Sequence, residues 1–215
     1  MPMKLYLSSY RIAETKSLEA LLGKSLTETK VALIPNAKDY YSERAWNYKV
    51  QSYITYFQNI GTKVTLVDLR KYDDPEVLRN ELGNYDLIWA MGGNTFCLRY
   101  EMKRSGFESC IRELLSDGVV YGGDSAGAIV AGSSLKGIEE ADIPEFAPEI
   151  IYEGLSLTSF MIIPHVGNVA FEPSLNSARS LHVHDNLKEL TDVQAAVFNG
   201  SNHEIVTGES SEDTE

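Results

Sequence analysis

Short apolar runs alternate along this chain with longer segments in which apolar residues recur at helical spacing. The apolar runs are short enough to be buried strands, and the segments between them have the period of helices, several of which stop at a glycine. This alternation predicts an α/β fold: a mostly parallel central sheet with helices on both faces. The expected strands are 5–7, 31–35, 64–67, 85–90, 119–121 and 160–163, and the expected helices are 14–22, 43–60, 74–83 and 107–115.

The last third of the chain is predicted to hold one more helix and a β-hairpin. The helix is expected around residues 174–190, and two apolar runs at 195–198 and 204–206 flank a turn typical of hairpins at 199–202. No repeat or linker divides the sequence, so residues 1–208 are expected to form a single domain. The acidic segment 209–215 has no apolar residue to bury and is expected to be disordered.

Charge and composition narrow the classes of function. A formal net charge of −12 argues against a nucleic-acid partner, which needs a basic surface, and means that an anionic substrate would need a local cation. There is neither an apolar run of the roughly 18 residues that span a bilayer nor a signal-peptide core. We therefore expect a cytoplasmic protein with no membrane partner. Cys97 and Cys110 lack metal-binding spacing and are expected to be reduced thiols.

The most informative motif is Gly123-Asp124-Ser125-Ala126-Gly127, placed between a predicted strand and a segment of small residues. A Gly-x-Ser-x-Gly sequence in a strand–turn–helix context is typical of a nucleophile elbow, in which a strained turn lifts the serine above the sheet edge. Ser125 is therefore predicted to be a catalytic nucleophile. The backbone N–H of Ala126 would then point toward a developing oxyanion.

A second oxyanion donor is expected from Gly92-Gly93-Asn94, which also follows a strand. Bare backbone N–H groups in a glycine turn can bind an anion. This turn precedes the serine motif by one crossover, so the two turns would be neighbours at one edge of the sheet. Gly93 and Ala126 are thus the predicted oxyanion hole.

A nucleophilic serine needs a base, and His165 is the predicted one. It follows the buried run 160–163, where catalytic residues are commonly displayed. His182 and His184 are two residues apart in a helical stretch, so they point to different faces and are interpreted as solvated. His203 lies near the hairpin turn.

The base in turn needs a carboxylate that fixes its tautomer. Asp192, just before the terminal strand pair, is the preferred choice. The chain order Ser125, His165, Asp192 differs from that of the α/β-hydrolases and argues against an esterase or lipase fold. The other candidates late in the chain are Glu172, Asp185, Glu189 and Glu204.

These residues resemble the peptidase E (aspartyl dipeptidase) group of serine peptidases, within the class I glutamine amidotransferase-like superfamily. The resemblance covers nearly the whole chain and is most specific at Gly92–Phe96, Gly123–Ala128 and Pro164-His165 with Asn168. The resemblance implies the class I glutamine amidotransferase-like fold, with Ser125 as the nucleophile and His165 as the base. It also implies that Gly93 and Ala126 form the oxyanion hole and that Asp192 matches the family's acid.

The same resemblance implies a substrate class. Members of known activity cleave dipeptides that begin with aspartate. The motif residues Asn94 and Asn168 are predicted substrate contacts, and Arg179 falls at about the spacing of a family basic residue that could hold a substrate carboxylate.

We therefore expect a serine-type peptidase of dipeptides or small peptides that needs no metal or organic cofactor and acts as a monomer or homodimer. Two alternatives stay open. One is a non-catalytic protein that binds a small ligand at the same turns, and the other is a cyanophycinase-like hydrolase of β-aspartyl links.

Overall fold

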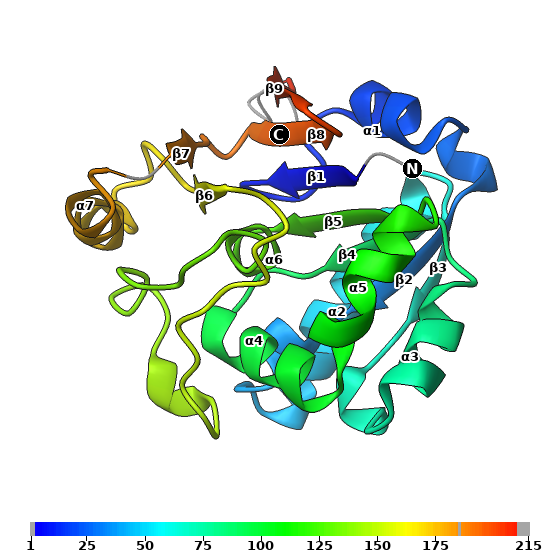
Figure 1. Ribbon diagram of the computed structural model, residues 1–215, viewed down its shortest axis with the longest axis horizontal. Helices are drawn as coiled ribbons and strands as arrows, with labels where there is room; N and C mark the ends of the chain where they lie inside the picture. Colours follow the sequence, from blue (N-terminus) through cyan, green and yellow to red (C-terminus); the bar gives the residue numbers. More distant parts are fainter. Residues whose placement is uncertain (1–2, 185, 210–215) are drawn as a thin grey trace.

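A computed structural model describes residues 3–184 and 186–209 and is built on a seven-stranded sheet (Figure 1). The strands lie in the order β3-β2-β4-β5-β1-β8-β9. The first five are mutually parallel, whereas β8 and β9 are antiparallel to their neighbours. The bounds are β1 Lys4–Ser8, β2 Lys30–Ile34, β3 Lys63–Leu66, β4 Leu87–Ala90, β5 Val120–Asp124, β8 Gln194–Asn199 and β9 Asn202–Thr207.

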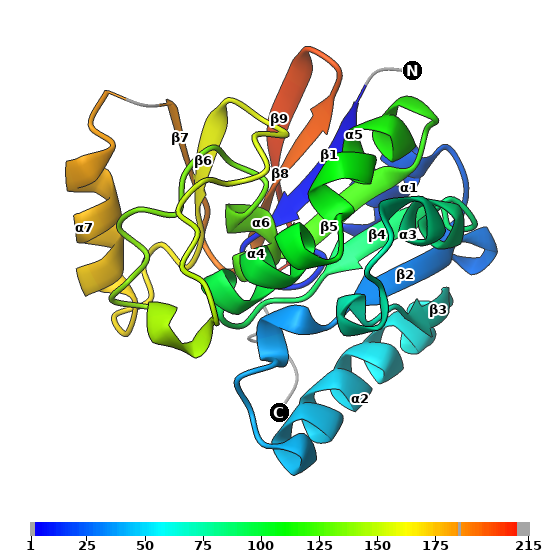
Figure 2. The same ribbon diagram turned by 60° about the horizontal axis from the view of Figure 1, so that its bottom comes forward.

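Helices cover both faces of this sheet, as Figure 2 shows with α2 on one side and α4 and α5 on the other. Strand residues alternate between two cores: Ala32 and Ile34 of β2 pack with α3, α4 and α5, whereas Val31 and Leu33 pack with α1 and α2. This double burial explains why the strands read as continuous apolar runs. The helices are α1 Thr15–Leu22, α2 Glu43–Asn59, α3 Pro75–Leu82, α4 Thr95–Arg104, α5 Phe107–Ser116, α6 Ala126–Ile129 and α7 Glu172–Leu181.

The region after the serine motif corrects one prediction. The helix expected around residues 174–190 ends at Leu181, and Asn186–Glu189 forms strand β7 instead. Strand β7 pairs in parallel with β6 (Phe160–Ile163) in a separate two-stranded sheet. Together with α7, this small sheet lies beyond the left-hand ends of β1 and β5 in Figure 1.

The other expected elements agree with the structure. The predicted sheet, the helices on both its faces and the C-terminal hairpin are confirmed. Helix α4 was not predicted, because its buried face includes Arg99 and Glu101 and so lacks a clean apolar stripe. Of the acidic segment 209–215, all but the first residue lies outside the described residues. No helix among the described residues has the length and apolar character to cross a bilayer.

Candidate active site

Ser125 sits at a strained turn between β5 and α6. Its φ and ψ are 49° and −111°, a conformation that a non-glycine residue keeps only when its surroundings enforce it. The surroundings here are tight, because a Cβ added to Gly127 would lie 2.1 Å from the carbonyl oxygen of Ala90. Only glycine allows α6 to approach β4 this closely, which explains the last glycine of the motif. Ser125 is only partly buried between fully buried neighbours.

His165 faces the serine from the loop after β6. Its Nε2 lies 2.9 Å from Ser125 Oγ, within hydrogen-bond reach for a nucleophile–base pair. The backbone of His165 has a positive φ of 64°, and its ring stacks on that of Phe171 at 4.3 Å between centroids. Packing thus holds the imidazole in the orientation that proton transfer from Ser125 requires.

Asp192 lies on the other side of the imidazole, just before β8. Its Oδ1 is 2.5 Å from His165 Nδ1 and also accepts a hydrogen bond from Ser9 Oγ. Burial alone would raise the pKa of Asp192, but its hydrogen bonds with His165, Ser9 and Asn168 together lower that pKa. The carboxylate therefore stays ionised and can accept the Nδ1 proton of His165.

Ser9 contacts both His165 and Asp192, and sequence analysis did not single it out. Its hydroxyl accepts the backbone N–H of His165 at 2.7 Å while donating to Asp192. Asn168, a predicted substrate contact, instead donates to Asp192 Oδ2 at 3.4 Å. A lone serine after a strand carries no signal in sequence. Only the pairing of β1 with β5 and β8 brings Ser9 to this place.

The glycine turn after β4 packs directly against the elbow. A Cβ on Gly92 would lie 3.1 Å from Ser125 Cβ, and one on Gly93, whose φ is +146°, would lie 2.2 Å from the Ala37 carbonyl oxygen. Within residues 3–184 and 186–209, the N–H groups of Gly93 and Ala126 have no hydrogen-bond acceptor. Two free donors beside Ser125 match the arrangement an oxyanion hole needs.

Comparison with known proteins identifies the family of this chain. The model of peptidase family S51 matches residues 7–206, a span that holds the elbow, His165 and Asp192. The chain belongs to peptidase family S51. The peptidase E resemblance inferred from the motifs is thereby confirmed at the level of the family.

Relatives of this S51 chain carry peptidase names. It is 38% identical over 88 residues to an uncharacterized peptidase of Listeria innocua (40% of this chain, 42% of that protein). It is also 29% identical over 176 residues to a peptidase E of Nostoc (82% of this chain, 67% of that protein). The chain spans about half the length of the first curated relatives it matches, namely 42% and 56%.

Solved structures support the fold. A crystal structure from Listeria monocytogenes EGD-e, provisionally named a peptidase E, superimposes with a TM-score of 0.82 at 23% identity (97% of this chain, 100% of that one). A peptidase from an acI-B1 Actinobacterium gives a TM-score of 0.71 at 19% identity (96% of this chain, 88% of that one).

Beneath Ser125 of this S51 chain lies a buried carboxylate that sequence analysis left unassigned. Asp124 accepts hydrogen bonds from Tyr53 Oη at 2.6 Å, Trp89 Nε1 at 2.8 Å and the Gly92 N–H at 3.3 Å. Burial raises the pKa of Asp124, and these hydrogen bonds act against that rise. The network links β5, helix α2 and the glycine turn, so it fixes the elbow relative to the turn.

Asp124→Ala should destabilise the protein by about 2–4 kcal/mol, because it leaves several buried donors without an acceptor. Urea denaturation measures this loss. The matched control is Asp117→Ala, which removes an exposed carboxylate paired with Arg79 and should cost about 0.5 kcal/mol or less. Equal losses in the two variants would contradict the role given to the Asp124 network.

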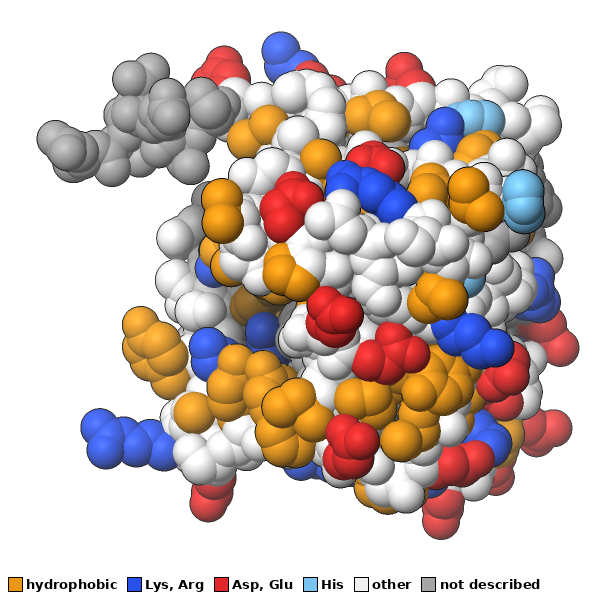
Figure 3. Space-filling model, turned by 90° about the vertical axis from the view of Figure 1, so that its left-hand side faces the viewer, with side chains coloured by type: hydrophobic (Ala, Val, Ile, Leu, Met, Phe, Trp, Pro, Cys, Tyr) orange, Lys and Arg blue, Asp and Glu red, His pale blue; other side chains and the backbone are white. Residues whose placement is uncertain are grey.

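A largely apolar pocket opens beside Ser125 and His165. Figure 3 views the side of the molecule toward which β1 and β5 point and shows hydrophobic side chains gathered over its lower half. Asp142 is the carboxylate among the residues that line this pocket, and it was missed from sequence because its loop carries no motif. The lining residues are Ser125, Ile129, Ile138, Ala141, Asp142, Pro164, His165, Phe171, Ser174 and Leu175.

Three of the residues considered from sequence lie in settings that differ from those expected. The Asn94 side chain is buried, caps α4 through the Cys97 N–H and donates to the Ile143 carbonyl, so it is not displayed to a substrate. Arg179 does not line the pocket and is held by Glu189 at 2.7 Å. His182, interpreted as solvated, is buried, with Nε2 2.9 Å from the Lys136 carbonyl.

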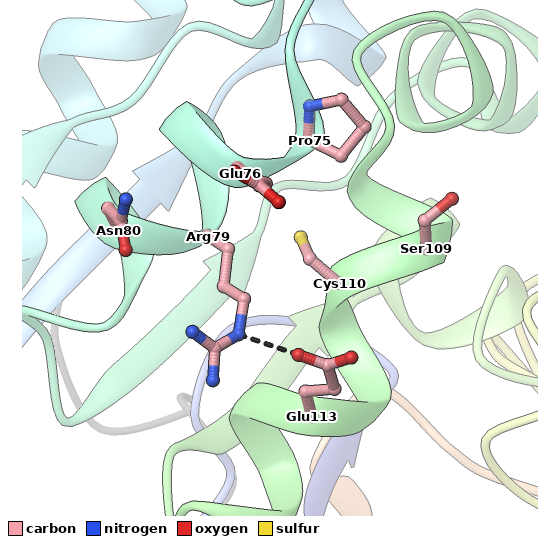
Figure 4. A pocket seen from close by; sticks show the side chains of 7 residues that line it. All are labelled: Pro75, Glu76, Arg79, Asn80, Ser109, Cys110 and Glu113. Carbon is pink, nitrogen blue, oxygen red and sulfur yellow. Dashed lines mark ion pairs between the residues drawn. The ribbon is translucent and has the colours of Figure 1, made fainter.

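A cavity of about 470 Å³ lies away from this site, between α3 and α5 (Figure 4). Its Arg79 is neutralised by Glu113 and Asp117. Burial raises the pKa of its Cys110 thiol to about 11, so the thiol is protonated and unreactive near neutral pH. Among the described residues, no cluster of three or more His, Cys, Asp or Glu side chains could hold a metal.

Proposed function

We propose that this chain is a serine peptidase in which Ser125, His165 and Asp192 form the catalytic triad. One observation carries the proposal: a continuous hydrogen-bonded chain runs from Ser125 Oγ through both ring nitrogens of His165 to Asp192. The strained elbow and the free N–H groups of Gly93 and Ala126 support it.

In the proposed reaction, Ser125 Oγ attacks the carbonyl carbon of the scissile peptide bond while His165 Nε2 takes the hydroxyl proton. The Gly93 and Ala126 N–H groups stabilise the negative oxygen of the tetrahedral intermediate. His165 then gives the proton to the leaving amine, and the acyl-enzyme forms. Water, activated by the same imidazole, hydrolyses the ester and regenerates Ser125.

The site favours short peptides with a free N-terminus. Both hydrogen bonds from Thr95 go to Asp142 Oδ2, which leaves Oδ1 without a donor among the described side chains and backbone groups. Burial raises the pKa of this carboxyl despite those hydrogen bonds. An ammonium group of the substrate would supply the missing partner and favour the charged form. A peptide α-amino group is the cation that a dipeptide brings to this pocket.

Labelling with a fluorophosphonate probe tests the triad. Wild type should be labelled, whereas Ser125→Ala and heat-denatured wild type should not. Absence of labelling in the folded wild type would favour a non-catalytic ligand-binding protein. A dipeptide library that includes β-aspartyl links, read by mass spectrometry, then separates an ordinary dipeptidase from a β-aspartyl hydrolase.

Asp142→Asn should raise KM for peptides with a free amine about 10- to 100-fold, because a charge-assisted hydrogen bond is lost. Its effect on N-acetylated peptides should be small. Steady-state kinetics on the two substrate series measures the ratio, and Glu145→Gln, an exposed carboxylate of the same loop, is the control. If Asp142→Asn keeps the wild-type preference for free amines, Asp142 does not bind the amine.

A further inference from the structure

The pocket beside Ser125 has an apolar wall that the proposed reaction leaves without a role. Ile129 ends α6, Ile138 lies in the loop that follows, and Leu175 lies near the start of α7. Each of these three side chains is at most 5% exposed, and all three pack in one hydrophobic cluster, with Phe171 against it. Because core side chains are close-packed, the wall has its shape before a ligand binds.

The polar groups of the pocket are poorly suited to an acidic side chain. Among the described residues that line it, none is a lysine or an arginine. The Ser174 hydroxyl already donates to the Gly137 carbonyl oxygen at 3.3 Å, and the positive end of α7 already carries the Glu172 carboxylate in its first turn. Asp142 lines the pocket and would repel a second carboxylate, which would be buried there without a cation.

The pocket is also small. The centres of water-sized molecules can move through about 30 Å³ of it, and one water takes up about 10–15 Å³ on this scale. It therefore has room for about two waters, or for a side chain of about two or three carbon atoms. A larger side chain would have to displace residues of the packed cluster, which is unfavourable.

We propose that this pocket binds a small aliphatic side chain, that of valine or alanine, on the N-terminal residue of the peptide; this inference rests on the proposed peptidase function. The residue whose carbonyl Ser125 attacks carries its α-amino group and its side chain on the same carbon. An amine bound by Asp142 therefore brings that side chain against Ile129, Ile138 and Leu175. Burial of its apolar surface favours binding, so the pocket selects an aliphatic residue in place of the aspartate that the sequence resemblance implies.

Hydrolysis of four dipeptides by the wild type tests this inference: Val-Ala, Thr-Ala, Asp-Ala and Phe-Ala. The kcat/KM for Val-Ala should exceed that for Thr-Ala, which has the same shape, by about 10- to 100-fold. It should exceed that for Asp-Ala by at least about 100-fold, because the carboxylate would be buried unpaired. It should exceed that for Phe-Ala by at least about 10-fold, because the ring does not fit. A kcat/KM for Asp-Ala or Phe-Ala equal to that for Val-Ala overturns the inference.

Leu175→Ala should move the size limit. The variant removes carbon atoms from the wall, so the ratio of kcat/KM for Leu-Ala to that for Val-Ala should rise about 10-fold. Leu181→Ala is the matched control, because Leu181 is exposed at the end of the same helix and should leave the ratio unchanged. If Leu175→Ala does not fold, Ile138→Val should raise the same ratio by a smaller factor. An unchanged ratio in the folded wall variant overturns the inference.

Labelling with a fluorophosphonate separates failure of this inference from failure of the proposed function. A wild type that is labelled, but prefers Asp-Ala or hydrolyses none of the dipeptides, overturns the inference and leaves the activated Ser125 in place. A wild type that is not labelled and hydrolyses none of them overturns both proposals.

Discussion

Ser125→Ala should lower kcat at least roughly 10³-fold, as triad knockouts do, without changing the stability of the fold. Among the residues that the structure describes, the hydroxyl makes one hydrogen bond, to His165 Nε2, and the strained turn is held by backbone packing around Gly127 rather than by the side chain. The residual rate would come from the oxyanion donors and substrate binding alone. Steady-state kinetics and thermal melting measure the two quantities.

His165→Ala should be nearly as damaging, and the double variant little worse than either single one, because triad members act as a unit. Ser201→Ala, at the exposed hairpin turn, serves as the control. More than a tenth of wild-type activity in Ser125→Ala would exclude the serine mechanism. Additive losses in the double variant would show that His165 acts on another step.

Asp192→Asn should lower kcat about 10²- to 10⁴-fold with little change in stability. The amide can still contact Nδ1 of His165, but it favours the wrong tautomer of the ring. The pKa of the Asp192 carboxyl is held low by its hydrogen bonds. Any stability the charged form contributes is therefore present above the ordinary pKa of about 3.8 and is lost only as pH falls through the lowered value.

The comparison for Asp192→Asn is Glu204→Gln. Glu204 is one of the four alternative acids late in the sequence, and it lies exposed on the edge strand β9, in register with Val197. Kinetics of the two variants should therefore differ by at least about 100-fold in kcat. Wild-type activity in Asp192→Asn would assign the orienting role to another group.

Sequence patterns placed Ser125 and His165 correctly at strand ends because the signal is local. A glycine-bounded serine between a strand and small residues specifies its own turn. Ser9 and Asp142 have no such local signal. Each reaches the site only through contacts with segments distant in the chain, and the bond from Ser9 to Asp192 joins residues 183 positions apart.

The structure surrounds Arg179 with residues that the sequence did not predict, for a related reason. If the helix had continued to residue 190, Glu189 would lie about 15 Å farther along its axis, ten residues at 1.5 Å each. The helix instead ends at Leu181, and the chain returns in β7. This turn brings the Glu189 carboxylate to 2.7 Å from the guanidinium and neutralises the cation that sequence analysis had assigned to the substrate.

The strand order has a consequence for how activity arises during folding. Strand β8 lies beside β1 although most of the chain separates them, so Asp192, His165 and Ser125 meet only after these long loops have closed. Such high contact order makes folding slow, because loop-closure entropy opposes the pairing until it is complete. A partly folded chain that has formed the parallel strands, but not yet docked β8, would hold Ser125 without an oriented base. If the proposed mechanism holds, hydrolysis would therefore begin only when the polypeptide has reached its native topology.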